Sequence, residues 1–572
     1  MKLKKIGKKW GGRKLYASLR VVGLIVSLPI VASAATTTLR VVSNVADKSR
    51  PGWEDAYTSI HDALAAMPTS SAAQGYNTIL VASGTYNISE TISVPAGKKW
   101  IHFRSINIDT GEEDPEHTIL DGGGTTAIME SVEVKTFVSG FTFANGYVQN
   151  EGSVTNRAAG YTDRGANGYG TISNCIFRGN VAVNTRATCI SSSLKFSQLI
   201  LNCVFSNNTH TITIPGERGC TIYVDARDTP QGYNDPLVKD CLFVDNRLSA
   251  PSAHGSTAYF KNLAVENCTF LTNHFTFTES GYPTSGGYVS LGTKTTLRDC
   301  RFTCNGVYSQ NNNTVAGTVV YVGGSECSFI DCEFSDIRCD GDQNKDTSGI
   351  VEVSGVNHAQ FVGCRFLRNY MDGKIAQIKM SNSCSNLIRN CLFTGLTRKN
   401  AGTTIIRQSG CNKGVVGVEV ANCTFVNNGD NHSFGNEQTS SCTNYLVNSV
   451  FTAQVGRPGT LANATQVVAS NCCFRTGKYT EGEFDHGNFF VNGESDLKLL
   501  DIANGDCHLR RNSPLRERGM MLPWMADGID IDGNPRVASV YGIPCSRDAS
   551  ALPDVGCYEC LIPIPGLIIT IQ

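Results

Sequence analysis

The chain has little charge and few long apolar runs. Asp, Glu, Lys and Arg make up only 17 % of its 572 residues, and the formal net charge is −1. The stretch Met1–Ala34 holds eight basic and no acidic residues; outside it, 41 basic residues stand against 50 acidic ones, a net charge of −9. Such a chain is not expected to bind nucleic acid, because that binding relies on a basic surface. No segment after Ala34 reaches the ~20 apolar residues of a membrane span.

What the chain does have at its start is a secretory pattern. Basic residues between Lys2 and Arg20 precede an apolar run from Val21 to Val31, and the small residues Ala32, Ser33 and Ala34 follow. This order predicts a signal peptide over residues 1–34, with an uncleaved anchor as the alternative. We therefore expect a secreted or cell-surface protein with no transmembrane span after signal cleavage.

A four-residue phrase recurs along most of the remaining chain. It consists of Asn or Asp (Gly in one copy), then Cys, then a variable residue, then Phe. Most copies follow one another at steps of roughly 30 residues, a period typical of solenoid repeats. The eleven copies, one of which has Ser449 in place of cysteine, begin at Asn174, Asn202, Asp240, Asn267, Asp299, Asp331, Gly363, Asn390, Asn422, Asn448 and Asn471. Asparagine recurs five residues after the cysteine at Asn180, Asn208, Asn246, Asn273, Asn305, Asn369 and Asn428.

This repeat predicts the fold. Cys and Phe are two residues apart, so on a β-strand they share one face while the residue between them faces away. A unit of about 30 residues cannot bury its own apolar face, but stacked units can. We therefore expect an all-β fold, a single-stranded right-handed parallel β-helix (a solenoid), with columns of Cys and Phe inside. The asparagines suit the bends, because Asn tolerates left-handed backbone and its amide can bond to the next turn.

Four regions follow from this pattern. They are the signal peptide (1–34), an N-terminal cap with early turns (35–130), the β-helix repeats (131–480) and a C-terminal module (481–572). In the cap, apolar residues between Trp53 and Met67 fall on one helical face. We expect a capping helix there, because the first turn of a solenoid exposes an apolar end and open strand edges.

Motifs at both ends of the chain carry a family resemblance. The entry Trp53–Leu64 and the phrases ILVASGTY and TILDGGG are similar to the opening turns of secreted bacterial β-helices. Residues 40–475 thus resemble the right-handed parallel β-helix proteins of the pectin-lyase-like superfamily. DCHLRRNSPLRERG (Asp506–Gly519), DIDGNPR (Asp530–Arg536) and DVGCYE (Asp554–Glu559) resemble the choice-of-anchor Q module of exported bacterial proteins.

The resemblance implies polysaccharide lyases and hydrolases as the catalytic possibilities. The phrases NTD, DD, GHG and RIK of galacturonan hydrolases are absent, so the catalytic residues, if any, stay unknown. The nearest fragment is the pair His254–Gly255, whose histidine we interpret as a solvated loop residue.

Three groups of polar residues are candidates for binding. Asp225, Arg227, Asp228 and Lys239 surround one strand exit, where they could bind an acidic sugar or form surface ion pairs. Arg301, Glu333 and Arg365 hold the variable position of three successive, evenly spaced copies, so they should stack about 5 Å apart, as a charge ladder or as part of a glycan-binding surface. Asp340, Asp342, Asn344 and Asp346 place oxygen atoms at alternating positions, which could hold Ca²⁺ or form a polar loop. No other cofactor is expected to be required.

The 23 cysteines fall into two sets. Ten belong to the repeated phrase and are expected to be buried thiols that act as small hydrophobes. Near the end of the chain, Cys557 and Cys560 have the spacing of a weak zinc motif, and a disulfide with Cys545 or Cys507 is an equal alternative.

Two functions are consistent with these patterns. We favour an exported or cell-surface protein that binds or displays, in a carbohydrate-binding or adhesion role without catalysis, because the structural repeat is complete and the sequence shows no convergent set of acids and bases. The alternative is a carbohydrate-active enzyme, a polysaccharide lyase or glycoside hydrolase acting on an acidic polysaccharide. In both cases the expected partner is a polysaccharide or cell-surface glycan.

Overall fold

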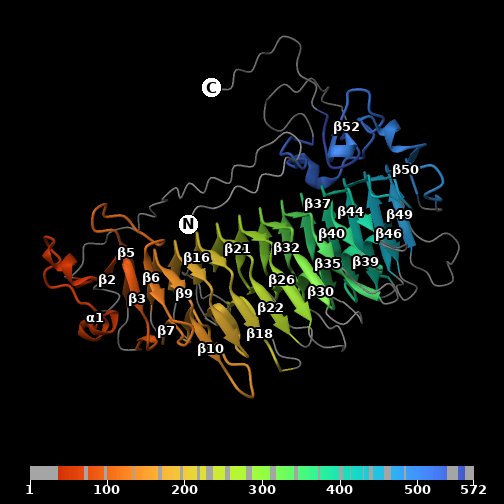
Figure 1. Cartoon of the computed structure of the whole chain (residues 1–572). Coiled ribbons are helices and arrows are strands. Elements are labelled where there is room, and N and C mark those ends of the chain that lie inside the picture. Colours follow the sequence, from red (N-terminus) through yellow and green to blue (C-terminus); the bar gives the residue numbers. More distant parts are fainter. Residues whose placement is uncertain are drawn as a thin grey trace, which may run out of the picture.

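A computed structural model shows a rod of stacked parallel β-strands, with a smaller C-terminal segment seated on one side of its far end (Figure 1). The structure describes residues 36–69, 75–95, 100–132, 135–164, 170–192, 198–214, 219–226, 236–250, 258–277, 286–309, 317–339, 346–371, 374–398, 404–411, 414–429, 431–436, 442–455, 466–481, 485–536 and 552–560. The predicted signal peptide lies outside these residues.

Four sheets run along the rod, and the chain visits them in the order A, B, D, C in each full turn. Each strand pairs in parallel with its counterpart one turn on, which confirms the predicted parallel β-solenoid. Sheet A comprises β1 (Thr38–Val41), β2 (Asn77–Ala82), β5 (Ile101–Ile106), β8 (Thr136–Ser139), β12 (Gly170–Ser173), β16 (Gln198–Leu201), β20 (Leu237–Lys239), β24 (Ala264–Glu266), β28 (Thr296–Arg298), β32 (Ser328–Ile330), β36 (Gln360–Val362), β40 (Asn386–Arg389), β44 (Val416–Ala421), β47 (Thr443–Val447) and β49 (Gln466–Ser470).

Sheet B carries the repeated phrase. It comprises β3 (Gly84–Asn87), β6 (Thr118–Asp121), β9 (Thr142–Ala144), β13 (Ile176–Arg178), β17 (Val204–Ser206), β21 (Leu242–Val244), β25 (Thr269–Leu271), β29 (Arg301–Thr303), β33 (Glu333–Ser335), β37 (Arg365–Leu367), β41 (Leu392–Thr394), β45 (Thr424–Val426), β48 (Val450–Phe451), β50 (Cys473–Arg475) and β51 (Phe489–Val491).

The other two sheets complete the turns. Sheet C comprises β4 (Ile92–Val94), β7 (Met129–Ser131), β11 (Tyr161–Asp163), β15 (Ala187–Ser192), β19 (Cys220–Asp225), β23 (Ala258–Lys261), β27 (Gly286–Leu291), β31 (Gly317–Val322), β35 (Asp346–Ser354), β39 (Lys374–Ser381), β43 (Thr404–Ser409) and β46 (His432–Asn436). Sheet D comprises β10 (Tyr147–Gln149), β14 (Val181–Val183), β18 (Thr209–Thr211), β22 (Arg247–Ala250), β26 (His274–Phe277), β30 (Gly306–Ser309), β34 (Arg338–Cys339), β38 (Tyr370–Met371) and β42 (Thr397–Arg398).

The phenylalanines of the phrase form one continuous stack inside the rod. From Phe143 to Phe474, successive ring centroids are 4.6 to 5.4 Å apart and the rings are within 17° of parallel. All of these rings are buried, as are the ten cysteines of the phrase, which are free thiols. The prediction that the Cys-x-Phe step faces the interior is therefore confirmed.

A ladder of buried asparagines holds the bend between sheets B and D. The Asn246 side chain accepts hydrogen bonds from the backbone N–H and the Nδ2 of Asn208, at 3.2 and 2.9 Å, and donates to the carbonyl of Phe205 at 2.8 Å. The same bonds recur from Asn180 to Asn305. At the preceding bend, between sheets A and B, the first residue of every phrase copy has a φ between 48° and 68°. Asn, Asp and Gly tolerate this left-handed backbone best, which explains the repeated choice.

The capping helix is shorter than predicted. Helix α1 covers Ile60–Ala66, and the Ser59 side chain caps it by accepting a hydrogen bond from the Asp62 backbone N–H. The segment from Trp53 to Ser59 is not helical, because Tyr57 pairs through its backbone with β1. Trp53 instead packs with Val42 and Ala82 in a small separate cluster.

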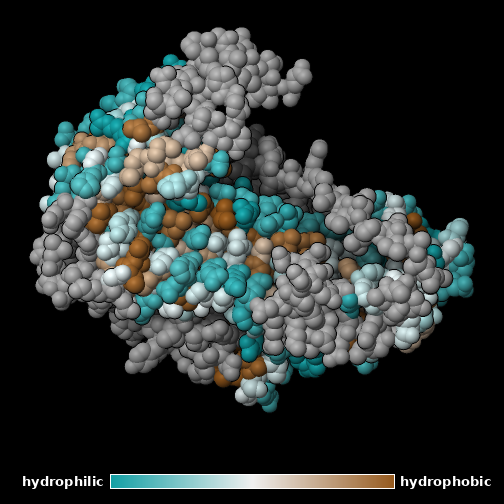
Figure 2. Space-filling view, turned by 180° about the vertical axis from the view of Figure 1, so that it is seen from behind, coloured by the Kyte–Doolittle hydropathy of each residue, from teal (hydrophilic) through white to brown (hydrophobic). Residues whose placement is uncertain are grey.

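Few other helices occur in the described part of the chain. They are short 3₁₀ turns at Val45–Ser49, Glu494–Leu497, Ile502–Asn504 and Pro523–Ala526. Across the described ranges, no helix has the length and apolar character needed to cross a membrane. The face opposite to that of Figure 1 shows apolar side chains interspersed with polar ones over its coloured surface (Figure 2).

The C-terminal segment, described over residues 494–536 and 552–560, covers the outer face of sheet B at the far end of the rod. It includes an antiparallel pair, β52 (Leu499–Asp501) and β53 (Asp506–Leu509). Its apolar side chains form a second core with outward-facing residues of sheet B. Sheet B contributes Leu392, Val426, Val450, Cys473 and Val491, and the segment contributes Leu497, Leu499, Cys507, Leu509, Leu515, Ile531, Val555, Cys557, Tyr558 and Cys560.

Candidate functional site

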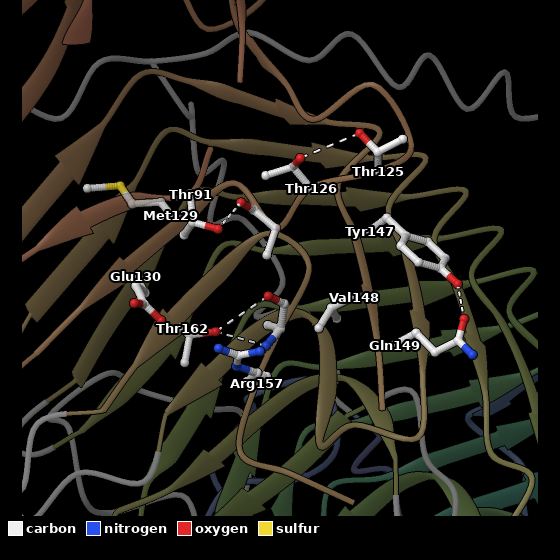
Figure 3. A pocket seen from close by; sticks show the side chains of 12 residues that line it. Thr91, Thr125, Thr126, Met129, Glu130, Tyr147, Val148, Gln149, Arg157 and Thr162 are labelled. Carbon is white, nitrogen blue, oxygen red and sulfur yellow. Dashed lines mark hydrogen bonds between the residues drawn. The ribbon is translucent and has the colours of Figure 1, made fainter. Parts of the chain in front are cut away.

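A groove lies near the N-terminal end of the rod. It has a volume of about 380 Å³ and lies where sheets C and D begin, between β4, β7, β10 and β11. Its lining is mainly polar: Thr91, Thr125, Thr126, Ala127, Met129, Glu130, Tyr147, Val148, Gln149, Arg157, Ala158 and Thr162. Figure 3 shows Glu130 and Arg157 on one side of the groove and Tyr147 with Gln149 on the other.

The polar side chains of the groove are held by neighbouring turns. The carboxylate of Glu130 accepts hydrogen bonds from Ser93 and Arg164, each at 2.8 Å. The hydroxyl of Thr162 accepts a bond from the Ala158 backbone N–H at 2.8 Å. Since Arg164 neutralises Glu130, the exposed guanidinium of Arg157 gives the groove a net positive charge.

Sheet B carries a second polar surface, the charged face, formed by Arg301, Glu333 and Arg365. Backbone pairing places the three residues opposite one another on consecutive turns, as their even spacing predicts. They do not form a continuous ladder of ion pairs, however. Glu333 accepts a hydrogen bond from Ser335 at 2.7 Å, and Arg365 turns toward the C-terminal segment, where it binds Asp532 at 3.0 Å and the carbonyl of Ile531 at 2.8 Å.

Two aspartates beside the charged face were not singled out by the sequence analysis. Asp299 and Asp331 hold the first position of successive phrase copies, so they lie on neighbouring turns. Burial and the neighbouring charge of Asp299 raise the pKa of Asp331 above its usual value. Gly363 leaves room for the Asp331 side chain, since a Cβ at Gly363 would lie 2.0 Å from its Oδ1.

His508 lies where the C-terminal segment meets the charged face. Its Nδ1 is 2.5 Å from Asp506 and its Nε2 is 2.5 Å from Asp532, the same carboxylate that binds Arg365. Burial lowers the pKa of His508, but hydrogen bonds and charges from the two aspartates raise it by a larger amount. The pKa of His508 is therefore above its ordinary value. A protonated His508 therefore links Asp506 to Asp532 within the C-terminal segment.

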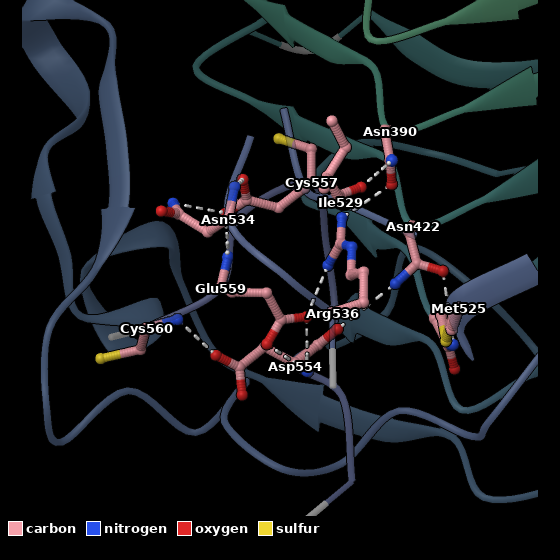
Figure 4. Close-up of polar contacts among 12 residues, drawn as sticks. Asn390, Asn422, Met525, Ile529, Asn534, Arg536, Asp554, Cys557, Glu559 and Cys560 are labelled. Carbon is pink, nitrogen blue, oxygen red and sulfur yellow. Dashed lines mark hydrogen bonds and ion pairs between the residues drawn. The ribbon is translucent and has the colours of Figure 1, made fainter. Parts of the chain in front are cut away.

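The same asparagine column that shapes the bend between sheets A and B also binds the C-terminal segment. Asn390 donates to the carbonyl of Ile529 at 2.7 Å and accepts from Arg536 at 2.7 Å (Figure 4). Asn448 donates to the carbonyl of Met520 at 2.8 Å. Arg536 also pairs with Glu559 at 2.8 Å, and both side chains are 0 % exposed.

The remaining predicted site residues are not assembled into one cluster. Asp225 pairs with Lys261 at 3.1 Å on sheet C, whereas Lys239 pairs with Glu266 at 3.1 Å on sheet A. Arg227, Asp228 and His254 lie outside the described residues, so the proposed sugar cluster around Asp225 stays a prediction.

The predicted metal sites also stay predictions. Asp340, Asp342 and Asn344 lie outside the described residues, and Asp346 is described only as the first residue of β35. Among the described side chains, no group of three His, Cys, Asp or Glu residues is arranged to hold a metal ion. Cys507, Cys557 and Cys560 are buried and form no disulfide with one another, and Cys545 lies outside the described residues.

Comparison with known proteins gives only distant structural similarities. No family model matches the chain, and no curated protein matches it either. Similar solved structures include a pectin methylesterase from carrot, with 12 % identity over 59 % of this chain and 84 % of that chain and a TM-score of 0.26. They also include an α-1,3-glucanase from Streptomyces thermodiastaticus (11 %, 81 % and 71 %, TM-score 0.26) and the alginate lyase AlyF-OU02 (9 %, 81 % and 81 %, TM-score 0.26). These values are too low to support a statement about function.

Proposed function

We propose that this chain is an exported or cell-surface β-solenoid protein that binds a glycan in its N-terminal groove and does not act on it chemically. The groove carries the proposal, because it is a concave polar site of a size typical for small-ligand pockets. Threonine hydroxyls, an amide and a guanidinium suit the hydroxyl groups of a sugar, and the Tyr147 ring offers an apolar surface beside them.

The same residues argue for binding rather than hydrolysis. Glycoside hydrolysis needs two carboxyl groups that flank the bond to be cut. Glu130 is the one carboxylate among the described groove residues, and Arg164 and Ser93 already hold it. The groove thus has a cation and hydrogen-bonding groups for a glycan, and its described lining gives Glu130 no partner carboxylate.

A glycan array run beside a polysaccharide-cleavage screen tests this function. We expect the purified mature chain to retain a restricted set of glycans and to release no products from them. Arg157→Ala should weaken binding at least tenfold, whereas Arg178→Ala, an exposed arginine on sheet B, should leave binding unchanged. Cleavage of any glycan that is abolished by Glu130→Gln would overturn the non-catalytic function.

Export is a separate part of the proposal, supported by the basic, apolar and small-residue order of the stretch Met1–Ala34. N-terminal sequencing of the chain recovered from a bacterial secretion host tests it. We expect the mature chain to start at Ala35 outside the cytoplasm; a chain that keeps Met1 and stays in the cytoplasm would contradict export.

A carbohydrate-active enzyme, a lyase or hydrolase acting on an acidic polysaccharide, is the second candidate. The observation that favours it is the aspartate pair beside the charged face, Asp299 and Asp331, whose turns are about 4.8 Å apart. The raised pKa of Asp331 suits a proton donor, and Arg301 lies on the adjoining strand. This candidate requires a cleavage activity that Asp331→Asn removes and Asp225→Asn does not.

A further inference from the structure

On the N-terminal side of the charged face, the outer face of sheet B carries a strip of half-buried apolar side chains. This apolar strip lies on the consecutive turns of β13, β17, β21 and β25 and consists of Ile176, Val204, Leu242, Val244 and Leu271. Backbone pairing places its members in the same two outward columns as Leu392 and Val426, which the C-terminal segment covers. Nothing in the glycan-binding function uses the strip.

The covered end of sheet B shows how this face binds polypeptide. Beside the apolar contacts, a column of asparagines at the bend between sheets A and B donates side-chain hydrogen bonds to main-chain carbonyls of the C-terminal segment. The donor and acceptor pairs are Asn390 and Ile529 at 2.7 Å, Asn422 and Asp554 at 3.4 Å, Asn448 and Met520 at 2.8 Å, and Asn471 and Arg518 at 3.0 Å. Every residue has a main-chain carbonyl, so this column binds a polypeptide backbone rather than one kind of side chain.

The same column continues beside the apolar strip, where its members are Asn174, Asn202, Asp240 and Asn267. The Nδ2 of Asn202 donates to Asn174 at 2.7 Å, and the Nδ2 of Asn267 donates to Asp240 at 2.7 Å. Asn202 and Asn267 are exposed, and each amide carries a second N–H that can donate to a main-chain carbonyl. This part of the face therefore has both features by which the covered end binds polypeptide.

Residues 561–572 follow the C-terminal segment directly and lie outside the described residues. Their sequence, LIPIPGLIITIQ, holds seven Leu or Ile residues and no charged residue. In an extended conformation, Leu567, Ile569 and Ile571 share one face. Burial of such side chains is favourable, and a short uncharged run of high β-propensity left in water is prone to aggregate. This tail therefore calls for an apolar surface to cover it.

The apolar strip is within reach of this tail. Cys560, the residue before the tail, belongs to the second core, and the neighbouring Tyr558 ring lies 4.3 Å from the His508 ring at the border with the charged face. From the turn of Arg365 to that of Leu242, the four steps between turns cover ~19 Å at ~4.8 Å each. Twelve extended residues span up to ~40 Å, about twice that distance.

We propose that residues 561–572 dock on the apolar strip of the same chain in an extended conformation. Their main-chain carbonyls accept hydrogen bonds from Asn202 and Asn267, and their aliphatic side chains pack on the strip. The arrangement repeats the combination of amide column and apolar column that holds the C-terminal segment. Sheet B thus binds two stretches of its own chain, one on each side of the charged face.

Photo-crosslinking of the mature chain tests the proposal. In Ile569→p-benzoylphenylalanine, we expect illumination to link the tail to a peptide that contains Val204 or Leu242, in a product with the mass of one chain. Phe490 provides the matched control, because it is 43 % exposed at the far end of sheet B. Phe490→p-benzoylphenylalanine should give no link to either peptide.

A pair of surface variants sharpens the result. Val204→Asp, made in the Ile569-labelled chain, should lower the yield of the link to the Leu242 peptide at least fivefold. Thr296→Asp, at a half-buried position on the outer face of sheet A, should leave the yield unchanged. If Val204→Asp does not fold, the map of the labelled chain without this change decides alone. The proposal is wrong if the label gives no link, links to a surface other than sheet B, or joins two chains.

Discussion

The outer face of sheet B has two halves that follow the same repeat and differ in chemistry. Toward the N-terminus, the variable residues Ile176, Val204 and Leu242 are half-buried. Toward the C-terminus, Leu392, Val450 and Cys473 hold the same position and are at most 2 % exposed, because the C-terminal segment packs on them. The interior is alike in both halves. The repeat therefore determines which side chains face the interior. The character of the outward-facing side chains depends on whether the C-terminal segment packs on that part of the sheet.

Between the two halves lies the charged face, which marks the border of the C-terminal segment. Arg365 is the member of that face that reaches the segment, through Asp532. Five experiments test this difference between the halves.

The largest effect is expected inside the rod, where the halves are alike. Phe302→Ala should lower the free energy of unfolding by ~3–5 kcal/mol, because it removes a fully buried ring and opens a cavity in the stack. Urea unfolding followed by circular dichroism measures it. A loss no greater than that of a surface variant would contradict the inward orientation of the phrase.

Removing the buried guanidinium of Arg536 in the C-terminal segment should lower the free energy of unfolding of that segment by nearly as much. Arg536→Ala leaves Glu559 charged and unpaired in the interior, and breaking a buried pair in this way costs ~3–5 kcal/mol. We expect limited proteolysis to release the C-terminal segment while the rod stays resistant. Digestion of the rod at the same rate would show that the two parts unfold together.

An outward charge should have different effects in the two halves. Leu392→Arg places a charge under the C-terminal segment and should also release it, at a cost of a few kcal/mol. Leu242→Arg, at the same repeat position but half-buried, should cost less than ~1 kcal/mol, as should Arg301→Ala on the exposed face. Equal proteolysis of the two leucine variants would remove the distinction between the halves.

The asparagine ladder allows a milder test. Asn246→Ile should cost ~1–3 kcal/mol, because the backbone N–H of Asn208 and the carbonyl of Phe205 lose a buried partner. The chain already has Ile337 and Leu396 in place of asparagine at equivalent positions, so the rod tolerates interruptions of the ladder. Thermal unfolding of Asn246→Ile beside Asn246→Gln measures the cost.

The smallest effect is expected from pH. The folded pKa of His508 is above the unfolded value of about 6.5, so its contribution is complete below that pH and is lost as the pH rises through the folded pKa. Hydrogen exchange of residues 499–509 should therefore speed up, beyond the intrinsic dependence of exchange on pH, as the solution passes from acidic to alkaline. His508→Gln should remove this pH dependence. A wild-type segment that is equally protected at both pH values would contradict the role of His508.

The interior could be predicted from the sequence because its signal is periodic. A Cys and a Phe two positions apart, repeated at a period of roughly 30 residues, leave one arrangement that buries both. The variable position also carried information. The change from Arg365 to Leu392 at this position marks where the outer face of sheet B becomes buried, although the sequence alone does not say which segment buries it.

The groove could not be predicted in the same way. Groove residues such as Glu130, Tyr147 and Arg157 come from the irregular early turns, where the phrase is degenerate and no spacing brings them together. The length of the capping helix was overestimated. The apolar residues from Trp53 to Tyr57 have helical spacing, but they are buried through a strand bridge and a separate apolar cluster instead.

The strict register of the evenly spaced turns has a consequence for the length of the molecule. Each such turn pairs with its neighbours in the same register and adds one ring to the same stack, so duplication of one whole turn preserves the backbone pairing and the ring stack. One added turn would move the groove about 4.8 Å farther from the C-terminal segment. Sequence duplication can thus change, in fixed increments, the distance between the groove and the C-terminal segment.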